Sequence, residues 1–158
     1  MRLASTTGDF MSFCNRDAVK AVQAFEGTGF KHIDFSFYRM NYENSPFMSD
    51  DWVKEIASVS KAAEKLGFDF VQAHSPGNDY FGKDKKEVID GNIRSIEACA
   101  YLGIDRIVVH SGRSNSFFLP QDMKTYLNGI KEFYSALFPA MEKYNVSVLA
   151  ENYIPADK

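Results

Sequence analysis

Two histidines and a glutamate stand at the ends of short apolar stretches that are far apart along the chain. His74 ends the stretch FDFVQAH, His110 ends DRIVVH and Glu151 ends VSVLAE. Neutral imidazole nitrogens and carboxylate oxygens are ligands that zinc and manganese accept in proteins. A single histidine at a strand end is more often a hydrogen-bonded boundary residue. Here two histidines stand at equivalent strand ends, and a glutamate stands at the end of the next strand. This combination instead predicts a divalent-metal site.

Two further charged residues are candidates for binding a substrate near these three. Side chains alternate between the faces of a strand, so His74 shares a face with Gln72, and Asp34 shares one with Ser36. For Asp34, direct substrate binding and hydrogen bonding to backbone groups of a neighbouring loop both stay open. Arg113 is either a ligand for an anionic substrate group or a solvated loop arginine.

A repeated unit must position these residues. An amphipathic helical pattern, a glycine or asparagine and a short apolar stretch recur at intervals of about 40 residues, the size of a strand with its crossover helix. The residues expected to end the helices in a left-handed conformation are Gly29, Gly67, Gly103 and Asn145. The pattern predicts strands over 3–6, 32–37, 68–74, 106–110 and 146–151. It predicts helices over 15–26, 49–67, 84–100 and 121–144, with Asn15 capping the first and Asp84 the third.

Strands that alternate with helices predict an α/β protein in which the strands pair in parallel through right-handed crossovers. The loops that follow the strands, over 38–48, 75–83 and 111–120, are longer than those that precede them. In barrels and open parallel sheets alike, ligands bind at this edge. Aromatic residues of these loops are candidates to wall a sugar pocket there: Tyr38, Tyr42, Phe47, Tyr80, Phe81, Phe117 and Phe118.

The composition of the chain argues against some classes of binding partner. The chain has 158 residues, a net charge of -3 and a pI near 5.6, which leaves no basic surplus for binding nucleic acid. No apolar run approaches the roughly 20 residues of a membrane-spanning helix, and the first residues lack the order of a signal peptide. The two cysteines have no metal-finger spacing and suit a reducing compartment. We expect a cytoplasmic protein that acts on a small molecule, with neither nucleic acid nor membrane as a partner.

Four segments, in this order and spacing, carry a resemblance to a known family: GFKHIDFSF, VQAHSPG, LGIDRIVVHSG and VLAENY. Together they resemble the xylose isomerase-like TIM-barrel superfamily, which contains sugar phosphate isomerases and epimerases and the zinc-dependent AP endonucleases. The resemblance implies a partial (β/α)8 TIM barrel of five parallel strands with four crossover helices. Residues 1–158 are then expected to form one domain that stops after strand five, the amino-terminal part of such a barrel.

The resemblance also implies roles for individual residues. Glu151 matches the glutamate that binds the divalent metal (Mn, Zn, Mg or Co) and acts as one of two acid/base carboxylates. His74 and His110 match histidines that contact the substrate or the metal. The implied reaction is proton transfer at the carbon α to the carbonyl of a sugar or sugar phosphate. The family's remaining ligands come from strands six to eight, so this chain alone is expected to be inactive.

Two other functions stay open. One is a zinc-dependent phosphodiesterase similar to the AP endonucleases, which the pair His74 and His110 suggests and the acidic pI disfavours. The other is a non-catalytic half-barrel that forms homo-oligomers through its exposed sheet edges, because an unpaired strand edge invites association.

Overall fold

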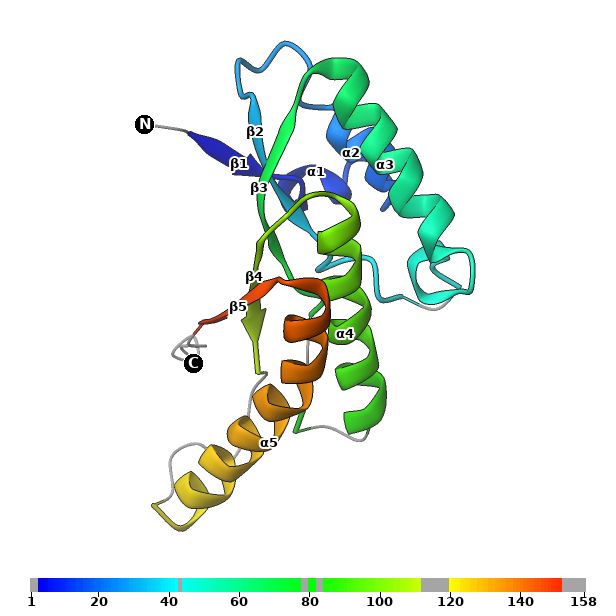
Figure 1. The fold of residues 1–158 in the computed structure, drawn as a ribbon. Coiled ribbons are helices and arrows are strands. Elements are labelled where there is room, and N and C mark those ends of the chain that lie inside the picture. The colour runs from blue at the N-terminus through cyan, green and yellow to red at the C-terminus, as the bar shows by residue number, and fades with distance from the viewer. Residues whose placement is uncertain (1–2, 43, 78–79, 82–83, 112–119, 152–158) are drawn as a thin grey trace.

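The computed structural model contains a sheet whose strands alternate with helices along the chain (Figure 1). The structure describes residues 3–42, 44–77, 80–81, 84–111 and 120–151. The strands are β1 (Ala4–Thr6), β2 (His32–Ser36), β3 (Asp69–His74), β4 (Arg106–His110) and β5 (Ser147–Glu151). The helices are α1 (Gly8–Met11), α2 (Ala18–Gln23), the 3-10 helix η1 (Pro46–Met48), α3 (Trp52–Leu66), α4 (Lys85–Tyr101) and α5 (Pro120–Tyr144).

The five strands form one sheet in the order β1-β2-β3-β4-β5, and every neighbouring pair is parallel. Figure 1 shows α2, α3 and α4 together on one side of this sheet. The predicted α/β architecture, part of a (β/α)8 barrel, is therefore confirmed, with each strand within one residue of its predicted bounds. The pairing of β2 with β3 has one irregularity. Ile33 lies opposite Phe70, but Asp34 lies opposite Gln72, so β3 contributes an extra residue between these pairs.

Several helix ends lie where local sequence signals predicted them. Gly67 and Gly103 adopt positive φ angles of 67° and 72°, and Asn145 adopts 53°, as predicted for residues that end a helix. Asp84 caps α4 as predicted, because its side chain accepts a hydrogen bond of 3.0 Å from the backbone N–H of Glu87. These ends fix where each chain segment turns back toward the sheet.

The crossover from β1 to β2 differs from its prediction. Asn15 does not cap the first predicted helix, since its own φ of 51° is left-handed. Asp17 is the cap instead, and its carboxylate accepts a hydrogen bond of 3.0 Å from the N–H of Lys20. The short helix α1 was not predicted, because a single turn leaves too few residues for a helical period to show. The crossover therefore holds two short helices where one longer helix was expected.

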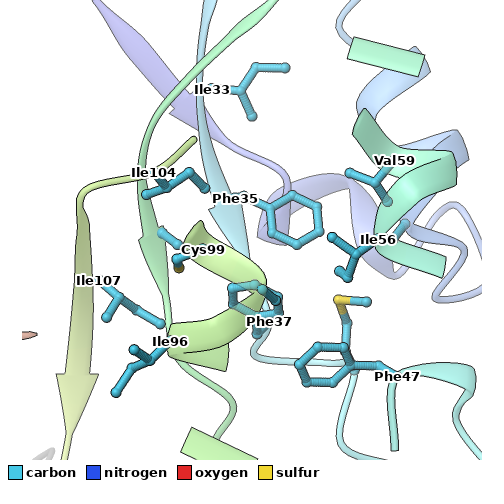
Figure 2. Packing of buried hydrophobic residues seen from close by; sticks show 14 of the residues in the cluster. Ile33, Phe35, Phe37, Phe47, Ile56, Val59, Ile96, Cys99, Ile104 and Ile107 are labelled. Carbon is cyan, nitrogen blue, oxygen red and sulfur yellow. The ribbon is translucent and has the colours of Figure 1, made fainter. Parts of the chain in front are cut away.

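The core lies between the sheet and the helices, with side chains from several of these elements (Figure 2). Phe35 of β2 and Phe37, the residue that follows this strand, are fully buried, with their rings in edge-to-face contact at 4.9 Å. Phe37 in turn packs on Phe47, which is also fully buried and so belongs to the core and not to the loop rim. Each such side chain contributes about 1.5–3 kcal/mol through its burial. Because side chains alternate, packing this face of β2 directs Asp34 to the opposite face.

The two outer strands of the described sheet are β1 and β5. Leu149 on β5 is 43% exposed, and Leu127 and Phe138 on α5 are more than half exposed. Leu149 therefore leaves an apolar side chain partly exposed on the outer strand β5. No helix in the described part of the chain combines the length and the apolar run that crossing a bilayer requires.

Candidate functional site

The carboxyl ends of the strands bring the predicted site residues to one edge of the sheet. Ser36 lies opposite His74, and His110 lies opposite Glu151. His74 pairs with Val108 on β4, so His110 lies farther toward the loops than His74. The helical crossovers make neighbouring strands parallel. Parallel pairing brings these residues, which are far apart in the sequence, next to one another.

His74, His110 and Glu151, which we call the donor cluster, each offer a ligand atom within 4.8 Å of the other two. Oε2 of Glu151 is 3.8 Å from Nε2 of His74 and 3.4 Å from Nε2 of His110. The two imidazole rings stack with their centroids 6.3 Å apart. The histidine side chains are about 30% exposed and that of Glu151 is 51% exposed. The structure thus brings together the three residues that the sequence suggested as metal ligands.

Asp34 lies beneath the donor cluster and contacts one of its members. Its side chain is 9% exposed, and its carboxylate is 2.9 Å from Nδ1 of His74. The other carboxylate contact is with Gln72, whose Nε2–H donates a hydrogen bond of 2.7 Å. The hydrogen bond to Asp34 raises the pKa of His74 above its ordinary value, with burial opposing and the charges of Asp34 and Glu151 adding to the rise.

Ser36 is buried and supports the start of the loops. Its backbone N–H donates to the Thr7 hydroxyl at 2.9 Å, and its own hydroxyl accepts a hydrogen bond of 3.3 Å from the N–H of Tyr38. The N–H of Thr7 also bonds the carbonyl of Asp34, at 3.0 Å. These contacts fix the carboxyl ends of β1 and β2 beside the donor cluster.

The loop aromatics divide into exposed and packed residues. Tyr38 is 56% exposed, and its ring covers Gly77, where an added Cβ would lie 3.0 Å from the ring. Tyr42 lies under the guanidinium of Arg16, which is 4.9 Å from the ring centroid. Tyr80 is fully buried. The sequence candidates Arg113, Phe117 and Phe118 lie outside the described residues.

Phe81 anchors the segment that follows His74. Its ring stacks on Tyr126 of α5, with centroids 4.9 Å apart. It also fills the space beside Gly129 so closely that a Cβ at that position would lie 2.6 Å from the ring. The neighbouring Tyr80 packs on Phe133 of the same helix at 5.0 Å. Helix α5 therefore packs against both Tyr80 and Phe81.

Sequence reasoning did not assign a role to Gln72 or Thr7. Gln72 had a visible signal, since strand alternation places it on the face of His74. Its contact with Asp34 depends on the extra residue in β3, which no local pattern marks. Thr7 had no comparable signal, because a hydroxyl at the end of a short strand is common.

Comparison with solved structures gives proteins of the same fold at low identity. The E. coli 3-keto-D-glucoside 4-epimerase matches with a TM-score of 0.62 and 15% identity, over 85% of this chain and 50% of that chain. A D-tagatose 3-epimerase-like protein matches with a TM-score of 0.69 and 14% identity, over 96% of this chain and 53% of that one. A Thermus thermophilus protein soaked with ZnCl2 matches with a TM-score of 0.61 and 16% identity, over 94% of this chain and 54% of that one.

The chain therefore spans about half the length of these solved structures. A comparison with curated proteins found no significant match. The model of the xylose isomerase-like TIM barrel family, by contrast, matches residues 22–157, which include β2 to β5 and the whole donor cluster. With the parallel sheet and its order already established, this match shows that the chain belongs to the xylose isomerase-like TIM barrel family.

Proposed function

We propose that the chain forms part of a divalent-metal-dependent isomerase or epimerase of sugars or sugar phosphates, which transfers a proton at the carbon α to a carbonyl. The observation that carries this proposal is the donor cluster, in which two imidazole nitrogens and a carboxylate oxygen lie within 4.8 Å of one another. They stand at the edge of the sheet where barrels of this kind bind their ligands.

The chemistry of the donors suits a transition metal. Imidazole suits zinc and carboxylate suits manganese, whereas magnesium prefers oxygen ligands alone and keeps several waters. Three protein donors also leave a position for a substrate oxygen, as in catalytic zinc sites. A bound divalent cation would supply positive charge to stabilise an enediolate. Zinc is also supported by a structural neighbour, because the Thermus thermophilus protein of the same fold was soaked with ZnCl2.

Glu151 is the residue of the donor cluster best suited to move the proton. It is half exposed at the loop edge, so a bound sugar can reach its carboxylate. A carboxylate held beside the acidic carbon can accept its proton and return it. Inversion at a carbon requires a second base on the opposite face of the substrate. We propose that this base comes from βα units beyond the five strands, within one barrel domain to which residues 1–158 contribute.

A sugar substrate is supported by the names of two structural neighbours, the 3-keto-D-glucoside 4-epimerase and the D-tagatose 3-epimerase-like protein. In both names the substrate is a sugar and the reaction inverts one carbon. At 14–15% identity these neighbours support the reaction class and not a particular sugar. Asp34 and Arg113 are further candidates for contacting the substrate, the latter through an anionic group such as phosphate.

Metal binding can be tested with a control that the chain itself provides. MnCl2 and ZnCl2 are titrated calorimetrically into the wild type and into His74→Gln, His110→Gln and His32→Gln. The first two variants should bind the metals much more weakly, whereas His32, at the amino end of β2, should be dispensable. Equal affinity in all four proteins contradicts the ligand assignment.

Turnover is tested on a chain extended by three further βα units, with a panel of ketoses and their phosphates in the presence of MnCl2. Interconversion of epimers that ceases on chelation supports the proposal, and no turnover of any sugar counts against it. Cleavage of a duplex with an abasic site would instead favour the phosphodiesterase function.

Self-association is a second candidate function, favoured by the open edge at β5. Leu149 is 43% exposed on that strand, and Phe138 is 53% exposed on α5. Sedimentation velocity distinguishes the two functions for the chain as it stands. A stable dimer without affinity for metal supports a non-catalytic module, and a monomer that binds metal supports the enzyme.

A further inference from the structure

Asp34 has an unusual position for a residue that would contact substrate. Its relative exposure is 6%, and both side chains that it contacts come from β3. Gln72 and His74 stand on the same face of that strand, so one carboxylate from β2 spans both. A buried carboxylate is costly unless its oxygens accept hydrogen bonds, and here one partner is itself a member of the donor cluster.

We infer that Asp34 is a positioning residue that fixes the His74 ring with the proton on Nδ1 and the lone pair on Nε2. A neutral imidazole has one donor nitrogen and one acceptor nitrogen. A carboxylate can only accept, so the nitrogen 2.9 Å from Asp34 must be the donor. The lone pair then lies on Nε2, the atom that is 3.8 Å from Glu151 within the donor cluster. As a role for the metal ligand His74, this inference rests on the proposed function.

Gln72 completes the arrangement by holding the second oxygen of Asp34. Because the carboxylate cannot donate, Gln72 must present its amide N–H, as the contact of 2.7 Å from Nε2 to Oδ2 records. With Oδ2 bonded to Gln72, the carboxylate is held facing His74, whose Nδ1 lies 2.9 Å from each of its two oxygens. Hydrogen bonds of this kind to ligating histidines set both the tautomer and the ring orientation at metal sites.

The substitution Asp34→Asn tests the inference because an amide has one donor and one acceptor. If its oxygen faces Gln72, its NH2 faces His74 and moves the ring proton to Nε2. If Gln72 turns its amide over, the Nδ1–H tautomer survives. The single variant should therefore lose the unique tautomer of His74. In the double variant Asp34→Asn/Gln72→Glu, the carboxylate at position 72 accepts only, which turns the Asn oxygen back to His74 and restores the wild-type tautomer.

The tautomer is read from long-range 1H–15N spectra of the histidine rings, recorded on metal-free protein at a pH where His74 is neutral. Affinity for MnCl2 is measured on the same variants. Asp34→Asn should weaken manganese binding by about 10- to 100-fold, and the double variant should recover part of that loss. Ser95→Ala is the control, because it removes a buried hydrogen bond of 2.8 Å within α4 and should alter neither measurement.

The outcomes separate this inference from the proposed function. An Nε2–H tautomer in the wild type overturns the inference, whether or not any variant folds. An Nε2–H tautomer in the double variant Asp34→Asn/Gln72→Glu also overturns it, because the Asn oxygen should there return the ring proton to Nδ1. If the wild type binds no metal while the tautomers follow the expected order, the proposed function fails and the orientation of His74 by Asp34 stands.

Discussion

Raising the pH through the pKa of His74 should change metal affinity and protein stability in opposite directions. The hydrogen bond to Asp34 raises this pKa above its ordinary value of 6.5, and the charges of Asp34 and Glu151 act in the same direction. At neutral pH a larger share of His74 is therefore protonated than of an ordinary histidine. Nε2 must lose its proton before it can bind a metal.

The two effects have definite signs. The folded chain holds the His74 proton more tightly than the unfolded chain does, so protonation stabilises the fold. That stabilisation is fully present below a pH of about 6.5 and is lost as the pH rises through the higher pKa of the folded state. Metal affinity should instead rise over the same range. One proton released per metal ion corresponds to about a tenfold gain in affinity, or about 1.4 kcal/mol, per pH unit.

Two measurements on one protein test this expectation from about pH 5 to 8. Urea unfolding of the metal-free chain gives the free energy of unfolding, and calorimetric titration with MnCl2 gives the affinity. Repeating the titration in buffers of different ionisation enthalpy counts the protons released. In Asp34→Asn the largest cause of the raised pKa of His74 is removed, so the rise in affinity should level off at lower pH, and at a lower plateau.

A joint rise of manganese affinity and unfolding free energy across the pH range would contradict the role given to His74. So would a constant affinity while the unfolding free energy falls, because His74 then titrates without binding the metal. If almost no protons are released per metal ion bound, it also follows, independently, that His74 does not bind the metal.

Four other substitutions have expected outcomes. Glu151→Gln should lower manganese affinity by more than the ~100-fold that a partner of a ligand can cost, yet shift the free energy of unfolding by only about 0.5 kcal/mol, since Glu151 is half exposed. Gly129→Ala should destabilise the chain to urea by about 1–3 kcal/mol, because its Cβ would lie 2.6 Å from Phe81. Gly91→Ala, whose Cβ would have no neighbour within 4 Å, should stabilise α4 by about 0.5–1 kcal/mol, and equal signs for the two glycines would refute the packing argument. Leu149→Lys should shift any dimer toward monomer in sedimentation velocity, and an unchanged dimer would place the interface elsewhere.

The strands and the donor cluster were predictable because short-range signals determine them. Apolar runs and left-handed residues such as Gly67 and Gly103 set the strand positions to within one residue. His74 and Glu151 could then be placed at strand ends, and parallel pairing brings such ends together. In this part of the chain, local pattern and tertiary contact agree.

The contact between Asp34 and Gln72 was not predictable in the same way. It depends on the extra residue in β3 after Phe70, a choice of register that pairs of strands make in three dimensions. The burial of Phe47 was not predictable for a different reason. The ring of an aromatic loop residue can line a ligand pocket or pack in the core, and the sequence does not distinguish the two. Here the ring of Phe37, 5.1 Å away, accounts for its burial.

Glu151 stands on the outermost strand of the described sheet, so the carboxylate of the donor cluster and the open edge belong to the same five residues of β5. Any strand that pairs with this edge would therefore change the burial and rigidity of Glu151, the metal ligand that we propose. Thermodynamic linkage makes this relation reciprocal. If strand pairing at this edge raises metal affinity by some factor, metal binding raises the affinity of that pairing by the same factor. The concentration of metal would then determine how completely the sheet is assembled.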